Sequence, residues 1–229
     1  MLITEVKQDY KWLRRFSLQF ITEKDFEKIE KSSIRLKYKK GEIILKQGAL
    51  STHIAFLEKG IVKFNYQNET SRNLILTIVA APKILGGANL FYKENNLFSF
   101  VAVEDCEVIL LDSDVLMEIM MNNARFSVVI FQVASQMFKT SVLNFISLAY
   151  KQKEGRIADI LLFLSAEVYS KLEFQTTLTR KEIAEFAGCS TENVIMSFSK
   201  WQKDNIIETA GKFIKIKDLE RLKYISKIG

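Results

Sequence analysis

The feature that most constrains the fold is a stretch near the C-terminal end of the chain, residues 178–216, which carries start and stop signals for two short helices. Thr179 is placed to cap the first helix, and Glu182 completes a capping box three residues later. Gly188 ends that helix, because glycine adopts the left-handed backbone conformation without a steric cost. Ser190 then caps a second helix after a turn of about three residues. This pattern predicts a helix-turn-helix.

The second helix is expected to bury one face and expose the other. Val194, Phe198 and Trp201 recur at helical spacing, which predicts burial of that side. The opposite side carries Thr191, Glu192, Met196, Ser199 and Lys200. Residues 206–216 follow with two strand-like runs around a turn near Gly211, which predicts a β-hairpin. A hairpin directly after a helix-turn-helix is typical of a winged DNA-binding module, and a helical hairpin inside a core is the alternative.

Composition allows substantial cores but says little about a polyanionic partner. The chain has 229 residues, 48% of them hydrophobic, and a net charge of +6. Residues 152–229 contain 13 Lys/Arg against 11 Asp/Glu, so the position of the charges must determine phosphate binding. The N-terminus does not resemble a secretory signal, and we expect no apolar run to approach the length that spans a membrane. We therefore expect a cytoplasmic protein with no membrane partner.

The predicted secondary structure changes along the chain before the helix-turn-helix. Residues 1–33 are polar and helix-like, with Thr22 and Asp25 available as caps. Residues 34–111 alternate apolar and polar side chains and carry regularly placed glycines, which predicts a compact all-β unit.

Residues 124–150 contain neither Gly nor Pro and predict one long helix. Seven positions follow the spacing of a coiled-coil seam: Phe126, Ile130, Val133, Met137, Thr140, Asn144 and Ser147. A second apolar stripe lies beside it: Val128, Phe131, Phe138, Val142 and Phe145. The helix is either buried in one large domain, or it packs on the β-unit with one face and on a second subunit with the other. In the second case Asn144 would set the register, and a two-fold pair of helix-turn-helices would bind two half-sites.

In their order, these segments resemble the Crp/Fnr superfamily of bacterial transcription regulators over nearly the whole chain. The matching stretches are YKKGEIILKQG, HIAFLEKGIVKF, LGGANLF, VEDCEVILLD, KEGRIADILLFL, TRKEIAEFAGCSTENV and GKFIKI. The resemblance implies an α+β fold with a cyclic-nucleotide-binding-like β-roll and flanking helices over 1–123, a dimerisation helix over 124–151, and a winged helix-turn-helix over 152–229.

The resemblance also implies a function and partners. It implies a homodimeric transcription regulator that binds double-stranded DNA with two-fold-related half-sites and contacts RNA polymerase. A small-molecule effector is a further expected partner, unless the sensor senses nothing. The alternative is an effector-dependent protein-interaction module with a degenerate DNA-binding domain.

Carried over residue by residue, the resemblance places the DNA interface at eight positions: Thr179, Arg180, Ser190, Thr191, Glu192, Met196, Lys200 and Lys212. The first three match residues that touch phosphates, and Glu192 matches an acceptor suited to a cytosine amino group. Thr191 and Met196 stand where well-known members have arginines that read guanine, so we do not expect the usual operator. Met196 could instead contact a thymine methyl, and Lys200 and Lys212 are phosphate candidates.

The sensor departs from the cyclic-nucleotide-binding members of the family. Gly87 replaces the Glu that holds the ribose hydroxyls, and residues 89–100 contain no Arg to pair with the phosphate. A buried phosphate without a charged partner is costly, so we do not expect cyclic AMP to bind. Seven residues are candidates for an altered pocket, which either takes a hydrophobic effector or is filled: Gly86, Gly87, Ala88, Leu97, Phe98, Ser99 and Ser141.

We expect no cofactor and no enzymatic activity. Residues 1–35 contain no cysteine, which excludes the iron–sulfur cluster of related sensors. His53 is the only histidine and lies where a loop meets a strand, so we expect a surface or capping role and no haem. Cys106 is expected to be a buried apolar residue of a strand; with Cys189 it forms neither a disulfide framework nor a metal site. Neither a P-loop nor a dinucleotide motif is present.

Overall fold

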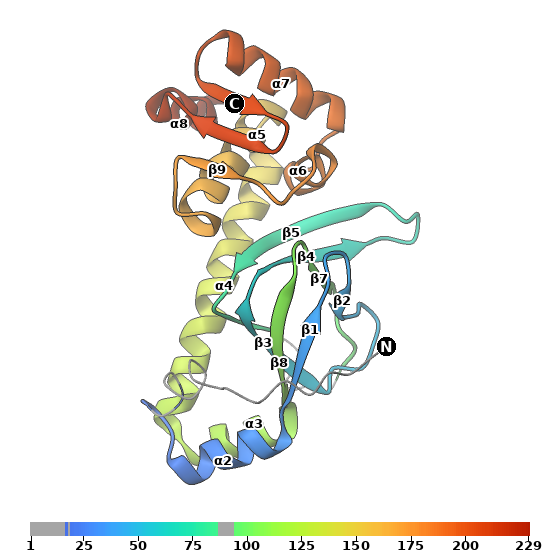
Figure 1. Cartoon of the computed structure of the whole chain (residues 1–229), viewed down its shortest axis with the longest axis vertical. Helices are drawn as coiled ribbons and strands as arrows, with labels where there is room; N and C mark the ends of the chain where they lie inside the picture. The colour runs from blue at the N-terminus through green and yellow to red at the C-terminus, as the bar shows by residue number, and fades with distance from the viewer. Residues whose placement is uncertain (1–16, 18, 87–93) are drawn as a thin grey trace. The chain divides into compact units, whose positions relative to one another are not determined.

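A computed structural model describes residues 17, 19–86 and 94–229 (Figure 1). The chain forms two compact units, one comprising residues up to Val62 together with Ala80–Lys139, and the other comprising Lys63–Val79 together with Thr140–Gly229. It passes from one unit to the other within strands β4 (Ile61–Gln67) and β5 (Asn73–Ala80) and within helix α4 (Ala124–Tyr150).

The N-terminal half is an antiparallel β-roll, as predicted. One sheet has the strand order β1-β8-β3-β6, and the other has the order β2-β7-β4-β5. The remaining strands are β1 (Ile34–Tyr38), β2 (Ile43–Leu45), β3 (His53–Lys59), β6 (Lys83–Leu85), β7 (Ser99–Ala102) and β8 (Cys106–Asp112). In the first sheet β8 pairs with both β1 and β3, with Phe56 opposite Ile109 in the register of β3 and β8.

Two short helices and the start of α4 cover one end of the first sheet. Helix α2 (Glu23–Ser32) is capped by Thr22, whose hydroxyl accepts from the backbone N–H of Asp25 at 3.2 Å, as the sequence predicted. It lies beside α3 (Ser113–Asn122), as Figure 1 shows. The Asn123 side chain accepts from the N–H of Phe126 at 3.0 Å and so satisfies a donor in the first turn of α4. These helices enclose a core that includes Phe26, Ile29, Phe56, Ile109, Leu116, Ile119 and Phe126.

A close approach of two chain segments fixes one turn of the β-roll. Gly60, between β3 and β4, has φ of +100°, and a Cβ there would lie 2.6 Å from Sγ of Cys106. Cys106 is buried in β8, as predicted, and burial raises the pKa of its thiol to about 11.

Helix α4 has the predicted bounds, and its two apolar stripes differ in exposure. The expected coiled-coil seam faces the protein itself, and its Asn144 donates to the carbonyl of Leu76 on β5 at 2.9 Å. The side-chain amide of Asn144 thus has a partner within the chain, and its role in the register of a subunit pair stays a prediction. The second stripe is the one left in solvent, with Phe131 72%, Phe138 71% and Phe145 69% exposed.

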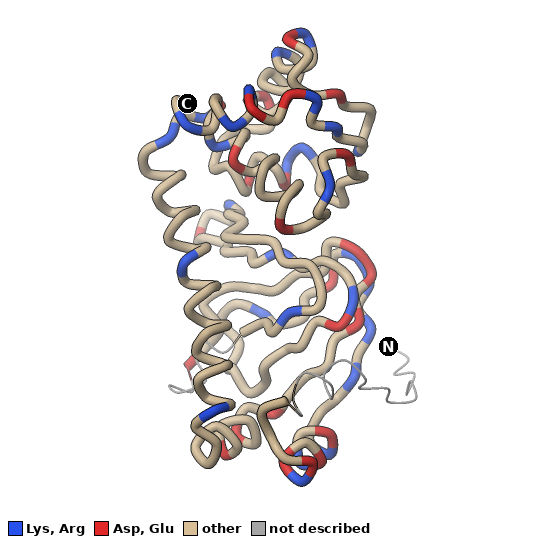
Figure 2. The backbone as a smooth tube through the Cα atoms, turned by 90° about the vertical axis from the view of Figure 1, so that its left-hand side faces the viewer, with Lys and Arg blue, Asp and Glu red and all other residues tan. Residues whose placement is uncertain are grey.

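The apolar character of α4 also corrects the expectation about membrane-spanning length. Arg125 and Lys139 are its only charged residues, so its tube is almost entirely tan in Figure 2. By length and composition alone, α4 is the one helix in the described part of the chain that could cross a membrane, and the expectation that no stretch approaches that length was wrong.

The second unit contains the predicted helix-turn-helix and wing. Its elements are α5 (Lys153–Phe163), the π-helical turn η1 (Leu164–Val168), β9 (Glu173–Gln175), α6 (Arg180–Ala187), α7 (Thr191–Lys203), β10 (Ile207–Ala210), β11 (Phe213–Ile216) and α8 (Leu219–Ile228). The hairpin of β10 and β11 pairs as expected, and β9 adds a third strand along β11 that the sequence did not reveal. The apolar face of α7 is buried, with Trp201 completely enclosed.

The predicted caps position the two helices of the motif. Thr179 and Glu182 form a complete capping box, in which the carboxylate of Glu182 accepts from the N–H of Thr179 at 2.8 Å. Gly188 ends α6 with φ of +60°. The hydroxyl of Ser190 then accepts from the N–H of Asn193 at 3.3 Å and starts α7. Residues 188–190 are thus the whole turn.

Candidate functional site

The exposed face of α7 combines polar and apolar side chains. Ser190 and Glu192 are exposed at its N-terminal end, Thr191 is half-buried, and Ser199 is exposed two turns later. Met196 points outward with 66% of its surface exposed. We define the reading face as Thr191, Glu192, Ile195, Met196 and Ser199. Side chains of these kinds match the donors, acceptors and methyl groups at the base edges of a DNA major groove.

Ile195 belongs to this face but was missed by the sequence-based prediction. It is 51% exposed and adjoins Met196. The spacing of Val194, Phe198 and Trp201 already places position 195 off the buried stripe, so the signal was present in the sequence.

The carboxylate of Glu192 is held in its ionised form. Hydrogen bonds from its own backbone N–H and from the Ser190 hydroxyl hold the pKa of Glu192 below its ordinary value. The positive end of the α7 dipole acts in the same direction. An ionised carboxylate only accepts hydrogen bonds, so Glu192 suits an amino donor such as that of cytosine.

Arg180 contributes to the structure of the module as well as to its charge. Its guanidinium carbon lies 4.6 Å from the centroid of the Phe198 ring, and Nη2 donates to the carbonyl of Gly211 in the wing at 2.9 Å. Burial lowers the pKa of Arg180, but arginine stays protonated at neutral pH. This side chain therefore joins α6, α7 and the wing, and its other donors remain suited to a phosphate.

The other predicted DNA contacts surround the reading face. Thr179 and Lys212 are exposed, the latter in the turn of the wing. Lys200 is exposed too, and its Nζ lies 3.0 Å from Oε2 of Glu154. An exposed ion pair of this kind contributes little to stability, so Lys200 can exchange Glu154 for a phosphate at little cost.

An ion pair within the second unit holds the beginning of α6. Nζ of Lys63 on β4 lies 2.7 Å from Oε1 of Glu182, and both side chains are largely buried. Burial favours the neutral acid, but the hydrogen bonds from Lys63 and Thr179 outweigh it and hold the pKa of Glu182 below its ordinary value. Glu182 thus serves both the capping box and the link to β4.

The predicted sensor residues are only partly described. Gly87 and Ala88 lie outside the described residues. Leu97 is exposed, Phe98 packs edge-on against Phe100 with ring centroids 5.4 Å apart, and the buried Ser99 hydroxyl accepts from the N–H of Gln47 at 2.9 Å. Two further candidates remain: Gly86 follows β6 with φ of +93°, and Ser141 belongs to α4 in the second unit.

The described residues contain no group of three or more His, Cys, Asp or Glu side chains that could hold a metal ion. Nδ1 of His53 lies 2.9 Å from the hydroxyl of Thr52 at the start of β3, which fits the local role expected of it.

Comparisons with known proteins agree with this arrangement. A family model described as a cyclic nucleotide-binding domain matches residues 35–123, and one described as a Crp-like helix-turn-helix domain matches residues 155–225. The cAMP-activated global transcriptional regulator CRP of Haemophilus influenzae is 23% identical over 182 residues, which cover 78% of this chain and 81% of that protein. The protein of the same description from Salmonella typhimurium is 27% identical over 193 residues, covering 78% and 87%. The solved structure of FixK2 from Bradyrhizobium japonicum superposes with a TM-score of 0.77 at 16% identity, covering 84% of this chain and 96% of that one.

Proposed function

Since the chain belongs to the Crp/Fnr family of DNA-binding transcription regulators, we propose that it acts as a homodimer that binds a two-fold-related DNA site through the reading face of α7. The observation that carries this proposal is the composition of that face. An ionised carboxylate and two exposed apolar side chains stand together near the N-terminal end of a capped helix.

The base preferences follow from the side chains present. Glu192 accepts from an amino group, while Ile195 and Met196 offer apolar contact to thymine methyl groups. Lysine and arginine side chains around the face, Arg180 and Lys212 among them, bind phosphates and orient the module without reading sequence. The expected half-site therefore contains a cytosine read by Glu192 next to thymines, and it lacks guanines read by arginine.

The dimer is supported by the exposed stripe of α4. Phe131, Phe138 and Phe145 leave a contiguous apolar surface in solvent, which is costly for a protein that remains monomeric. A second copy of the same helix covers it in an isologous pairing. The dimer then presents two reading faces, which two-fold-related half-sites require.

The proposed effector differs from the cyclic AMP that the names of the relatives state. The Haemophilus and Salmonella proteins are described as cAMP-activated. This chain has Gly87 and an arginine-free stretch over residues 89–100 in the segment where the resemblance places the nucleotide-binding charges. We therefore propose that cyclic AMP is not its effector, and that a regulator of this type works in the cytoplasm with RNA polymerase.

Selection of DNA from a random pool at moderate salt, followed by footprinting, tests the DNA-binding part. We expect a symmetric protected site and an affinity that falls steeply as salt rises. Light scattering coupled to size-exclusion chromatography should give the mass of a dimer, and calorimetry should detect no binding of cyclic AMP. Failure to enrich any sequence, with no DNA affinity at physiological salt, would favour the effector-dependent protein-interaction module instead.

A further inference from the structure

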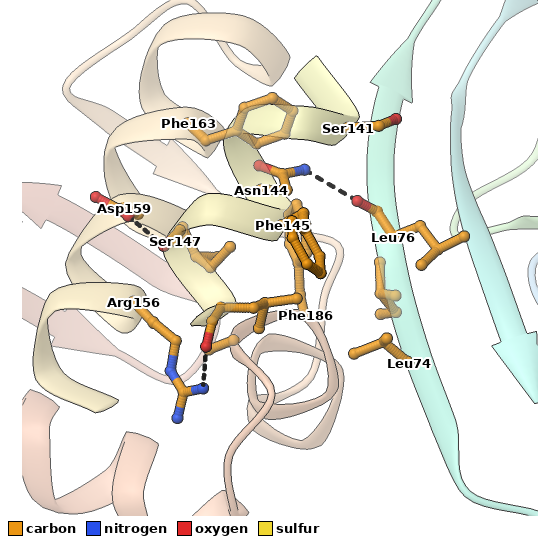
Figure 3. Close-up of a pocket in the computed structure, with 14 residues that line it drawn as sticks. Leu74, Leu76, Ser141, Asn144, Phe145, Ser147, Arg156, Asp159, Phe163 and Phe186 are labelled. Carbon is orange, nitrogen blue, oxygen red and sulfur yellow. Dashed lines mark hydrogen bonds between the residues drawn. The ribbon is translucent and has the colours of Figure 1, made fainter. Parts of the chain in front are cut away.

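A partly open cavity of about 200 Å³ lies in the second unit (Figure 3), and no residue of the reading face lines it. Its walls are mainly apolar and come from β5, α4, α5 and α6, with Leu76, Phe145, Phe163 and Phe186 among the lining side chains. An apolar cavity of roughly 150 Å³ accommodates benzene. This one therefore has room for a single aromatic ring with a short substituent.

Most polar groups around the cavity are already engaged within the chain. Asn144 donates to the carbonyl of Leu76, and the Ser147 hydroxyl donates to Oδ2 of Asp159 at 2.5 Å. Oδ1 of Asp159 accepts from Nζ of Lys151 at 2.8 Å, and the Ser226 hydroxyl donates to it too. The negative charge of Asp159 is thus compensated by groups of the protein.

Arg156 is different, because part of its guanidinium lacks a partner. Nε is buried and forms no hydrogen bond with any described residue, and Nη1 reaches the carbonyl of Leu148 only at 3.4 Å. A buried cationic donor left unsatisfied is costly. The residue also stands in the first turn of α5, where the helix dipole disfavours a cation. An anion bound at the terminal nitrogens of this guanidinium would offset its charge and relieve the cost at the helix end.

We propose that this cavity binds a small aromatic carboxylic acid, with the ring among the phenylalanines and the carboxylate on Arg156. A planar guanidinium binds a carboxylate through two parallel hydrogen bonds, and the apolar walls remove the ring from water. The ligand would contact α6, the first helix of the helix-turn-helix, through Phe186. Its effect on DNA affinity rests on the proposed DNA-binding function, whereas its binding does not.

The test uses full-length protein and a matched pair of probes, phenylacetate and phenylacetamide, in calorimetry. The two probes share the ring and differ in the charge that Arg156 recognises. We expect phenylacetate to bind at least tenfold more tightly than the amide. Arg156→Gln should remove this difference, whereas Arg72→Gln, an exposed arginine of the loop before β5, should retain it.

A second variant keeps the test valid if Arg156→Gln fails to fold. Ser141→Trp places an indole at the cavity wall from an exposed position of α4 and should abolish binding of both probes. Equal affinities for the acid and the amide, unchanged binding by Ser141→Trp, or no binding of phenylacetate at millimolar concentrations would overturn the proposal.

DNA affinity separates this proposal from the proposed function. We expect saturating phenylacetate to change the affinity for a selected DNA site at least threefold in the wild-type protein and not in Arg156→Gln. Sequence-specific DNA binding without any binding of the probe would overturn the ligand site alone. Binding of the probe by a protein that binds no DNA would overturn the proposed function alone.

Discussion

Helices α4 and α7 both expose apolar side chains, but the neighbouring exposed residues are hydrophobic on α4 and largely polar on α7. The exposed stripe of α4 consists of hydrophobic residues, with Phe131 and Phe138 as its largest members. On α7, Ile195 and Met196 stand beside the carboxylate of Glu192 and the hydroxyls of Thr191 and Ser199. A second copy of the α4 stripe would offer mainly apolar side chains for contact, whereas the edges of base pairs offer donors, acceptors and methyl groups. The two faces therefore fit two kinds of partner.

The charges close to each face support the same distinction. Along its 27 residues α4 carries only Arg125 and Lys139, so little charge would be desolvated when the helix pairs with a copy of itself. The reading face has basic residues around it, including Arg180 and Lys212, which a polyanion requires. If the two assignments are right, variants of the two faces should fail in different measurements.

The largest effect is expected from Phe131→Glu combined with Phe138→Glu. Loss of a buried phenylalanine costs about 3–5 kcal/mol, and two carboxylates facing two more across the helix pair add repulsion. We expect a monomer by light scattering and at least a hundredfold loss of affinity for the selected DNA site, measured by fluorescence anisotropy.

The control replaces an exposed aromatic residue elsewhere. Tyr224→Glu on α8 introduces one carboxylate at an aromatic position 54% exposed in the wild-type protein, and should leave the mass of the dimer unchanged. If the double variant remained dimeric with full DNA affinity, α4 would not be the pairing surface.

Glu192→Ala should affect specificity and leave the dimer intact. Removing the acceptor for one base should reduce discrimination at that base pair by about 1–3 kcal/mol. Competition between the selected site and its single-base variants measures this loss. Glu208→Ala, an exposed carboxylate of the wing hairpin, should leave discrimination unchanged. A uniform change at all base pairs would contradict a base contact by Glu192.

Arg180→Ala should weaken binding to all sequences alike, by about tenfold, and lower the slope of log affinity against log salt by about one. The substitution removes a phosphate partner and also the link between Phe198 and the carbonyl of Gly211. Arg180→Lys separates the two roles, because lysine keeps the charge but not the planar fork. A change confined to one base pair would reassign Arg180 to base recognition.

The free energy of unfolding should depend on pH through Glu182, whose ionised carboxylate stabilises the beginning of α6. Because its pKa lies below the ordinary value of 4.5, the stability that the ionised form provides is present above that pH. It is lost as pH falls through the lower folded-state pKa. Glu182→Gln should thus reduce stability by about 1 kcal/mol at pH 7 and progressively less below pH 4.5, as measured by urea unfolding.

A second substitution, at Lys63, tests whether the ion pair with Lys63 accounts for the effect of Glu182. In a Lys63→Met background the same substitution should cost less at pH 7, since the ion pair with Glu182 is already absent. An identical cost in both backgrounds would show that the capping box alone accounts for the effect.

The sequence predicted the helix-turn-helix well because its signals are local. Capping by Thr179 and Ser190 and the left-handed Gly188 are decided by residues within one turn of each other. Contacts between distant segments were not accessible in this way. Neither the pairing of β9 with β11 nor the ion pair between Lys63 and Glu182 leaves a periodic trace in the sequence.

The role of the α4 stripes shows the same limit. Both stripes are apolar, and spacing alone does not say which one meets the protein's own β5. At the functional site, helical periodicity predicted the exposed residues of the reading face, except Ile195, which the prediction omitted. The cavity at Arg156 required the packing of four elements that are far apart in the sequence.

The smallest effect is expected from Ile195→Thr, and it tests the comparison most directly. Threonine keeps a branched β-carbon but replaces one arm of the side chain with a hydroxyl, so contact with a thymine methyl is reduced while the helix surface is little changed. We expect about a threefold loss at one base pair, with the dimer mass unchanged. Replacing that thymine by uracil, which lacks the methyl, should cost the wild-type protein about as much and the variant almost nothing. Equal losses for both proteins would mean that Ile195 does not touch the methyl, and that an exposed apolar residue on α7 is no more specific than one on α4.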